Sequence, residues 1–120
     1  MKLEANLVHI HEKDGVLSVA FRGGATSMDR YLILSRTTYL DEQDIALGLD
    51  GVHIEIGGQN CSGYKAVSAI EFMEFGLQVS IIGGILEGFP SNTEIAVHGS
   101  KVLSNLPDLR VACARLLRSV

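Results

Sequence analysis

Four histidines are the side chains in this 120-residue chain whose chemistry first suggests a site. His9 and His11 are two positions apart and share a face if their segment is a strand, whereas His53 and His98 lie elsewhere in the chain. Imidazole is a common ligand of zinc, but no carboxylate recurs at a ligand-like spacing beside these histidines. We therefore predict no metal site and no cofactor. The alternative is a small β-fold protein that binds a ligand or a metal.

Nucleophilic catalysis has no well-formed candidate in the sequence. Ser62 does not stand in the G-x-S-x-G pattern of a nucleophile elbow. Cys61 lies in an acidic neighbourhood, whereas a reactive thiolate needs positive charge nearby. Cys61 and Cys113 are far apart and form no metal-binding spacing. We predict that the protein is not an enzyme, with a site using His9, His11 or Cys61 as the alternative.

Negative charge is concentrated in the middle of the chain. Residues 37–63 contain five acidic residues and no Lys or Arg, a formal charge of -5 within a chain whose net charge is -4, so the remainder carries +1. Acidic loops are commonly no more than solvated surface. Such a stretch gains a function when a basic partner exists, because charge complementarity accelerates association and selects partners.

Composition excludes several classes of protein. Hydrophobic residues make up 47% of the chain and charged residues 20%, which is too apolar for intrinsic disorder. The acidic balance argues against nucleic-acid binding. The apolar run 77–86 is interrupted by polar residues and glycines, and the first fifteen residues lack the apolar core of a signal peptide. We expect one domain, residues 1–120, in the cytoplasm with reduced cysteines, without membrane or nucleic-acid partners.

Period-two hydrophobic patterns predict about seven strands. They cover residues 3–11, 16–22, 30–36, 52–56, 66–73, 77–82 and 93–98. Asp14-Gly15 predicts a tight hairpin, and residues 74–76 a second one. We expect every neighbouring pair of strands to be antiparallel.

The end of the chain has a helical pattern instead. Leu109, Ala112, Cys113 and Leu116 recur at helical spacing, which predicts a helix from about 106 to 118 that covers one face of the sheet. Ser104 or Asn105 is the expected cap. The predicted fold class is mainly β (α+β): an antiparallel sheet or small sandwich with one C-terminal helix packed on it.

The central segment also resembles a known family. The runs 31–36, 40–45, 47–50 and 54–56, with Gln59 and the Ser62-Gly63-Tyr64 triplet, are similar to the immunity protein 10 family. The resemblance covers about residues 30–72. It departs at Val52-His53, where the family commonly has aromatic residues, and at Lys65-Ala66, where it tends to have glycine.

The resemblance implies a function without catalysis. Members of this family accompany bacterial polymorphic toxins and protect the producing cell by neutralising a cognate toxin. Many such toxins act on nucleic acids and present basic clefts, which an acidic loop complements. The hypothesis for the toxin-binding residues is Tyr39, Asp41, Glu42, Asp44, Asp50 and Tyr64. The alternatives are that Gly48, Asp50 and residues 62–64 only build turns, and that residues 81–89 form the edge of a homodimer.

Overall fold

The computed structural model describes residues 2–23, 31–38, 51–57, 62–82 and 93–117. The strands are β1 (Lys2–Glu4), β2 (Leu7–Lys13), β3 (Val16–Arg22), β4 (Tyr31–Thr37), β5 (His53–Ile56), β6 (Ser62–Tyr64), β7 (Val67–Met73), β8 (Gly76–Ile81) and β9 (Thr93–His98). The helices are α2 (Ser100–Ser104) and α3 (Leu106–Leu116). The mainly β prediction is confirmed, with alternating apolar residues in the strands and a helical stripe at the end of the chain.

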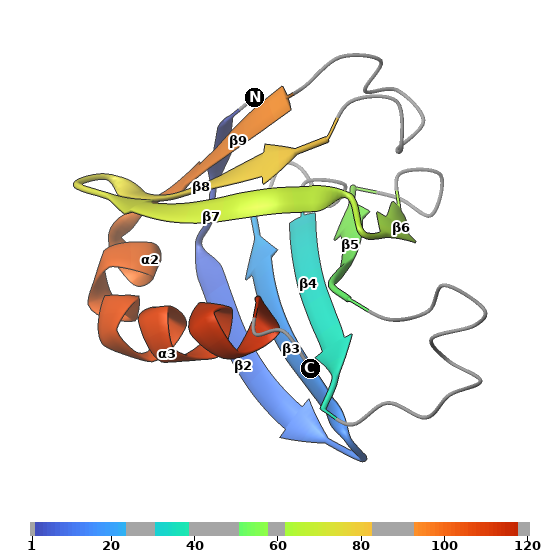
Figure 1. Ribbon diagram of the computed structural model, residues 1–120. Helices are drawn as coiled ribbons and strands as arrows, with labels where there is room; N and C mark the ends of the chain where they lie inside the picture. The colour runs from blue at the N-terminus through green and yellow to red at the C-terminus, as the bar shows by residue number, and fades with distance from the viewer. Residues whose placement is uncertain (1, 24–30, 39–50, 58–61, 83–92, 118–120) are drawn as a thin grey trace.

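The strands form two sheets that face each other (Figure 1). One sheet has the order β1-β9-β8-β7 and the other the order β2-β3-β4-β5-β6. Every pair in the five-stranded sheet is antiparallel. Its inner face packs against the four-stranded sheet and against α3, and the buried residues of this face are apolar.

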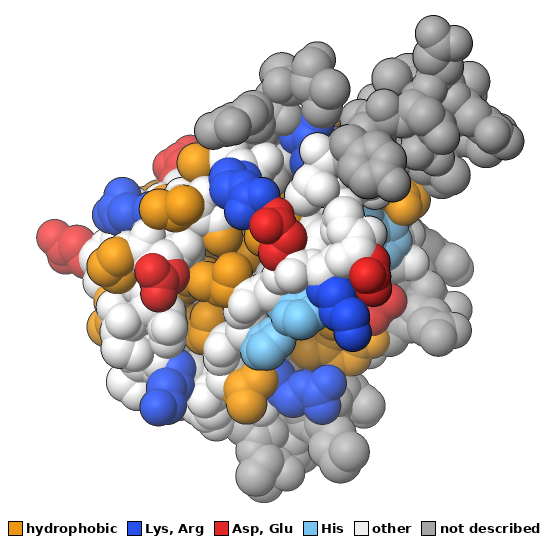
Figure 2. All heavy atoms as spheres, turned by 90° about the horizontal axis from the view of Figure 1, so that it is seen from below, with side chains coloured by type: hydrophobic (Ala, Val, Ile, Leu, Met, Phe, Trp, Pro, Cys, Tyr) orange, Lys and Arg blue, Asp and Glu red, His pale blue; other side chains and the backbone are white. Residues whose placement is uncertain are grey.

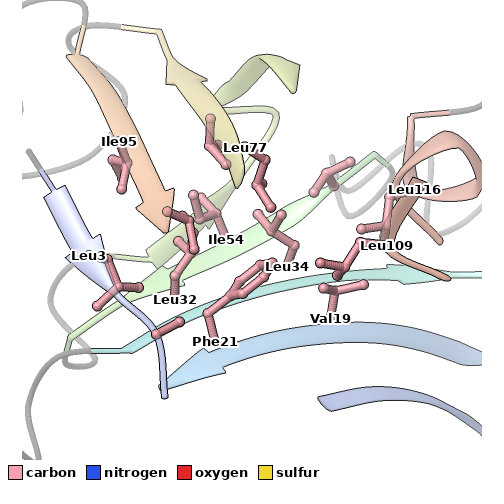
Figure 3. Packing of buried hydrophobic residues seen from close by; sticks show 14 of the residues in the cluster. Leu3, Val19, Phe21, Leu32, Leu34, Ile54, Leu77, Ile95, Leu109 and Leu116 are labelled. Atoms are coloured by element: carbon pink, nitrogen blue, oxygen red, sulfur yellow. The ribbon is translucent and has the colours of Figure 1, made fainter. Parts of the chain in front are cut away.

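The core lies between the two sheets. Phe21 and Leu34 of the five-stranded sheet point toward Leu77 of the facing sheet, and all three are fully buried (Figure 3). Leu109 and Leu116 of α3 reach the same cluster. The apolar residues of both sheets therefore share one core, and their burial stabilises the packing of the two sheets.

Helix α3 packs against β2, β3 and β4, and side chains of β2 and β4 contact its C-terminal end. The guanidinium of Arg36 on β4 donates a hydrogen bond of 2.7 Å to the carbonyl oxygen of Leu116. Arg115 forms an ion pair with Glu12 of β2. The last carbonyls of a helix have no partner within the helix, so Arg36 supplies one from the sheet.

Two glycines occur where the backbone conformation requires them. Asp14 and Gly15 both have positive φ, 55° and 78°, and connect the paired residues Lys13 and Val16. This is the predicted two-residue hairpin, and it is confirmed. Gly76 has φ 148°, and a Cβ there would lie 2.3 Å from the carbonyl oxygen of Val97.

The segment predicted as one strand over 3–11 is two strands in different sheets. The amide of Ala5 donates to the carbonyl of His98, whereas the next amide, of Asn6, donates to Arg22. The chain thus changes sheets between Ala5 and Asn6. β1 runs parallel to β9, so the expectation that every neighbouring pair is antiparallel is wrong at this pair.

Two short elements also differ from the prediction. β6 and α2 were not predicted, because three and five residues are too few for a periodic pattern. Asn105 occupies the N-cap position of α3, but its side chain makes no cap hydrogen bond there. It donates to the carbonyl of Lys101 at 2.7 Å, so it supports the end of α2 instead.

Candidate functional site

The outer face of the five-stranded sheet is the surface opposite the core. Because successive side chains of a strand point to opposite faces, the residues between the buried positions form this surface. Its residues are Leu7, His9, His11, Lys13, Val16, Ser18, Ala20, Arg22, Tyr31, Ile33, Ser35, Thr37, His53, Glu55, Ser62 and Tyr64. We call this surface the outer face. It combines aromatic, apolar, imidazole and charged side chains.

Tyr64 lies on this face at the β6 edge of the sheet. It is opposite His53 in the β5–β6 pairing, and the two rings meet edge to face with centroids 4.8 Å apart. The Tyr64 side chain is still 37% exposed. A tyrosine held by one neighbour and open on its other side has the properties of an interface anchor, since little side-chain entropy remains to be lost.

Two described contacts flank residues 39–50, the part of the acidic stretch between β4 and β5, which we call the acidic segment. At its start the amide of Thr38 donates to the carbonyl of Gly15, and at its end Gly51 lies beside Lys65, where a Cβ on Gly51 would be 3.4 Å from Lys65 Cγ. The amide of Lys65 in turn donates to Val52. The end of the segment and the Tyr64-Lys65 pair are therefore neighbours in the fold.

Most of the predicted toxin-binding residues fall within that segment. Tyr39, Asp41, Glu42, Asp44 and Asp50 lie outside the described residues, as do Cys61 and residues 83–89. Of the six predicted contacts, Tyr64 has a described position. Sequence reasoning missed its partner His53 and the rest of the outer face. The alternation of His53 and Glu55 with buried residues was the available signal, but it does not reveal which strands are neighbours.

His9 and His11 share a face, as predicted. Their rings stack with centroids 5.5 Å apart and an angle of 26° between the planes. Figure 2 shows histidine side chains in contact at the surface, with hydrophobic and basic side chains beside them. His53 lies on β5 and His98 in the other sheet, so the fold does not gather the four. Within the described ranges, no group of three or more His, Cys, Asp and Glu could hold a metal ion.

Cys113 is the described thiol, and it faces the core from α3. It is free and 1% exposed. Burial raises the pKa of the Cys113 thiol to about 11, because a thiolate would lose its hydration there. Cys113 is therefore a neutral packing group. It lacks the lowered pKa that a nucleophile or metal ligand needs.

Fold and surface together define a two-sheet β protein with C-terminal helices and an accessible sheet face. The chain belongs to the immunity protein 10 family, whose model matches residues 4–97. The match extends beyond the segment 30–72 that carried the resemblance and includes residues of both sheets. Searches of curated proteins and of solved structures gave no significant match. Neither described helix is long and apolar enough to cross a membrane.

Proposed function

We propose that this immunity protein binds a cognate bacterial polymorphic toxin and neutralises it through a protein–protein interface. The family match over residues 4–97 carries the proposal. Inhibition by binding requires a complementary surface and no reacting group, so the proposal includes no catalysis and no cofactor. It places the protein in the cytoplasm of the producing cell, where thiols such as Cys113 stay reduced.

We propose that the interface combines the acidic segment with Tyr64 at the edge of the outer face. The proximity of Gly51 to Lys65 supports this combination, because it places one end of the segment beside Tyr64. A basic toxin cleft would be steered toward the carboxylates, and the half-exposed ring would supply buried contact area. The proposed contacts are Tyr39, Asp41, Glu42, Asp44, Asp50 and Tyr64.

A binding titration against the toxin domain encoded by the gene immediately upstream tests the function. The affinity itself tests the function, and its change between low and high salt tests the assignment of the interface. Nanomolar affinity that weakens at high salt supports both, since exposed charges are screened. Tight binding that is insensitive to salt supports the function and excludes the acidic segment as the main contact. Absence of binding to that domain contradicts the proposal.

Charge reversal tests the acidic segment directly. The double variant Asp41→Lys and Asp44→Lys should weaken toxin binding at low salt, mainly by slowing association. A matched control is Glu71→Lys with Glu74→Lys, which makes the same change in charge at exposed positions on β7 and its turn. Affinity of the first variant within about threefold of the control would exclude these carboxylates as contacts.

Truncation of Tyr64 tests the aromatic contact. Tyr64→Ala should weaken toxin binding by about thirtyfold, the effect of an interface residue worth about 2 kcal/mol. Phe75→Ala is the matched control, because Phe75 is 40% exposed, close to the 37% of Tyr64, and lies in the β7–β8 turn of the other sheet. Equal affinities of the two variants would contradict the placement of Tyr64 in the interface.

A further inference from the structure

The stacked His9–His11 pair lies on a strand at the edge of its sheet. Among the described residues, β2 ends the order β2-β3-β4-β5-β6 and has a neighbour on one side only. Both imidazoles are exposed, and their ring centroids are 5.5 Å apart. Two imidazoles on one face at this spacing can ligate one transition-metal ion, for which imidazole is a suitable donor. Zinc commonly takes four ligands in a tetrahedral arrangement, so the pair supplies half of them.

The chain's own described residues do not complete such a site. His53 and Glu55 share the outer face, but β3 and β4 separate β5 from β2, which is three strand spacings or about 14 Å. His98 belongs to the other sheet. The missing ligands therefore have to come from a source other than the described residues of the same chain.

We propose that His9 and His11 form half of a transition-metal site and that a second copy of the chain completes it by pairing its β2 antiparallel to this one about Ile10. The exposed edge supports this register. Lys13 and Val16 flank a two-residue turn and form a hydrogen-bonded pair, so the backbone groups of Val8, Ile10 and Glu12 point away from β3. Across a two-fold axis at Ile10, these three residues pair with the same three residues of the copy.

This register also brings the four imidazoles together. His9 of each copy lies directly opposite His11 of the other, in a pair without backbone hydrogen bonds, where the Cα atoms approach to about 4.5 Å. Both pairs lie on the outer face. Lys13 then faces the copy's Leu7, and Glu12 faces the copy's Val8 while keeping its ion pair with Arg115. No like charges oppose each other along the seven residues of β2.

Helices α2 and α3 lie near this edge of the sheet, and both contact β2 (Figure 1). Helix α3 packs across β2, β3 and β4 on the inner face. Helix α2 follows Gly99, which approaches Ala5, two residues before β2. Antiparallel pairing therefore places the two α2 helices at opposite ends of the interface.

Sedimentation of the full chain with Zn²⁺ alone, under reducing conditions, tests the proposal. We expect the mass to change from 12.9 kDa to twice that value, with one zinc per two chains and reversal by EDTA. With zinc at one hundred times its dissociation constant, the apparent dimer dissociation constant should fall by about one hundredfold. His9→Ala and His11→Ala should each abolish the effect. His53→Ala, on the same face and three strands away, should retain it.

Other outcomes overturn the inference. One zinc per chain without a change in mass would exclude the second copy as the source of ligands. Zinc binding that survives His9→Ala would place the metal elsewhere. A dimer that forms equally well with and without zinc would exclude the metal from the contact. His9 and His11 are exposed and His53 lies on the outer face, so none of them belongs to the core and circular dichroism should show all three variants folded. The test does not depend on toxin binding.

Discussion

Replacing Arg36 with methionine removes the side chain that ties the end of helix α3 to the five-stranded sheet. Arg36 lies on the inner face of β4, opposite Leu17, and donates a 2.7 Å hydrogen bond to the carbonyl oxygen of Leu116. Methionine keeps the apolar stem but has neither the charge nor the donor. The carbonyl would then lose its partner at a position that is partly buried.

The magnitude follows from the kind of bond that is lost. A hydrogen bond from a charged group contributes about 1.5–3 kcal/mol, and a cation near a helix C-terminus adds about 0.3–1 kcal/mol. Partial solvent access lowers the sum, so we expect the free energy of unfolding to fall by about 2 kcal/mol. For a chain of this size, that corresponds to a decrease of roughly 6–12 °C in Tm.

Urea denaturation of matched variants provides the assay. Arg22→Met is the control, because Arg22 is an exposed arginine on the same sheet whose guanidinium stands 5.9 Å from the centre of the Tyr31 ring. We expect it to cost less than about 1 kcal/mol. Arg36→Lys, which keeps the charge, should lie between wild type and Arg36→Met. If the free energies of unfolding of Arg36→Met and the Arg22→Met control differ by less than about 0.5 kcal/mol, the hydrogen bond from Arg36 to Leu116 does not stabilise the fold.

Three further changes test the packing and the buried thiol. Gly76→Ala should lower the free energy of unfolding by at least about 2 kcal/mol, because the new alanine Cβ would collide with the Val97 carbonyl. Near-wild-type stability in chemical denaturation would refute that close approach. Leu109→Ala, at a residue 0% exposed, should cost about 2–5 kcal/mol, whereas Val111→Ala, on the same helix and 64% exposed, should stay within about 0.5 kcal/mol; equal midpoints would contradict the assigned buried face. The raised pKa of Cys113, about 11 against an ordinary 9.0, means that the folded state holds the thiol proton more tightly. The stabilisation by the protonated thiol is complete below pH 9 and is lost as pH rises from 9 toward 11. Over that interval the difference in free energy of unfolding between wild type and Cys113→Ala should decrease by up to about 2–3 kcal/mol. A constant difference would show that the thiol is not desolvated.

Local sequence patterns predicted much of the fold. Alternation located the strands to within a residue or two over 16–22, 77–82 and 93–98, and the Asp14-Gly15 step fixed a hairpin. These features depend on residues close in sequence, where side-chain periodicity and turn conformation act directly. Helix α3 was likewise visible in its buried stripe.

The sheet change near the N-terminus was not predicted from the sequence, although two consecutive apolar residues, Leu7 and Val8, interrupt the alternation there. Alternation has the same period in a strand of either sheet, but its phase changes here: Leu3 and Ala5 are buried, whereas the inward positions of β2 are Val8 and Ile10. The amides of Ala5 and Asn6 bond to His98 and Arg22, which are far away in sequence. The parallel pairing of β1 with β9 follows from the same long-range contacts.

For the candidate site, charge counting identified the acidic segment and the family resemblance drew attention to Tyr64. The sequence could not show that Tyr64 meets His53 edge to face, because that contact depends on the pairing of β5 with β6. Nor could it show that the His9–His11 pair lies at the edge of a sheet. The proposed metal site depends on that position as much as on the residue types.

By itself, the sequence determined the mainly β class, the hairpin at Asp14-Gly15, the buried face of the last helix and membership of the immunity protein 10 family. The tertiary structure decided which strands are neighbours, where the chain passes from one sheet to the other and which side chains share the outer face. The physical reason is that periodicity records only which side of an element is buried, whereas strand order is set by contacts between residues far apart in the chain.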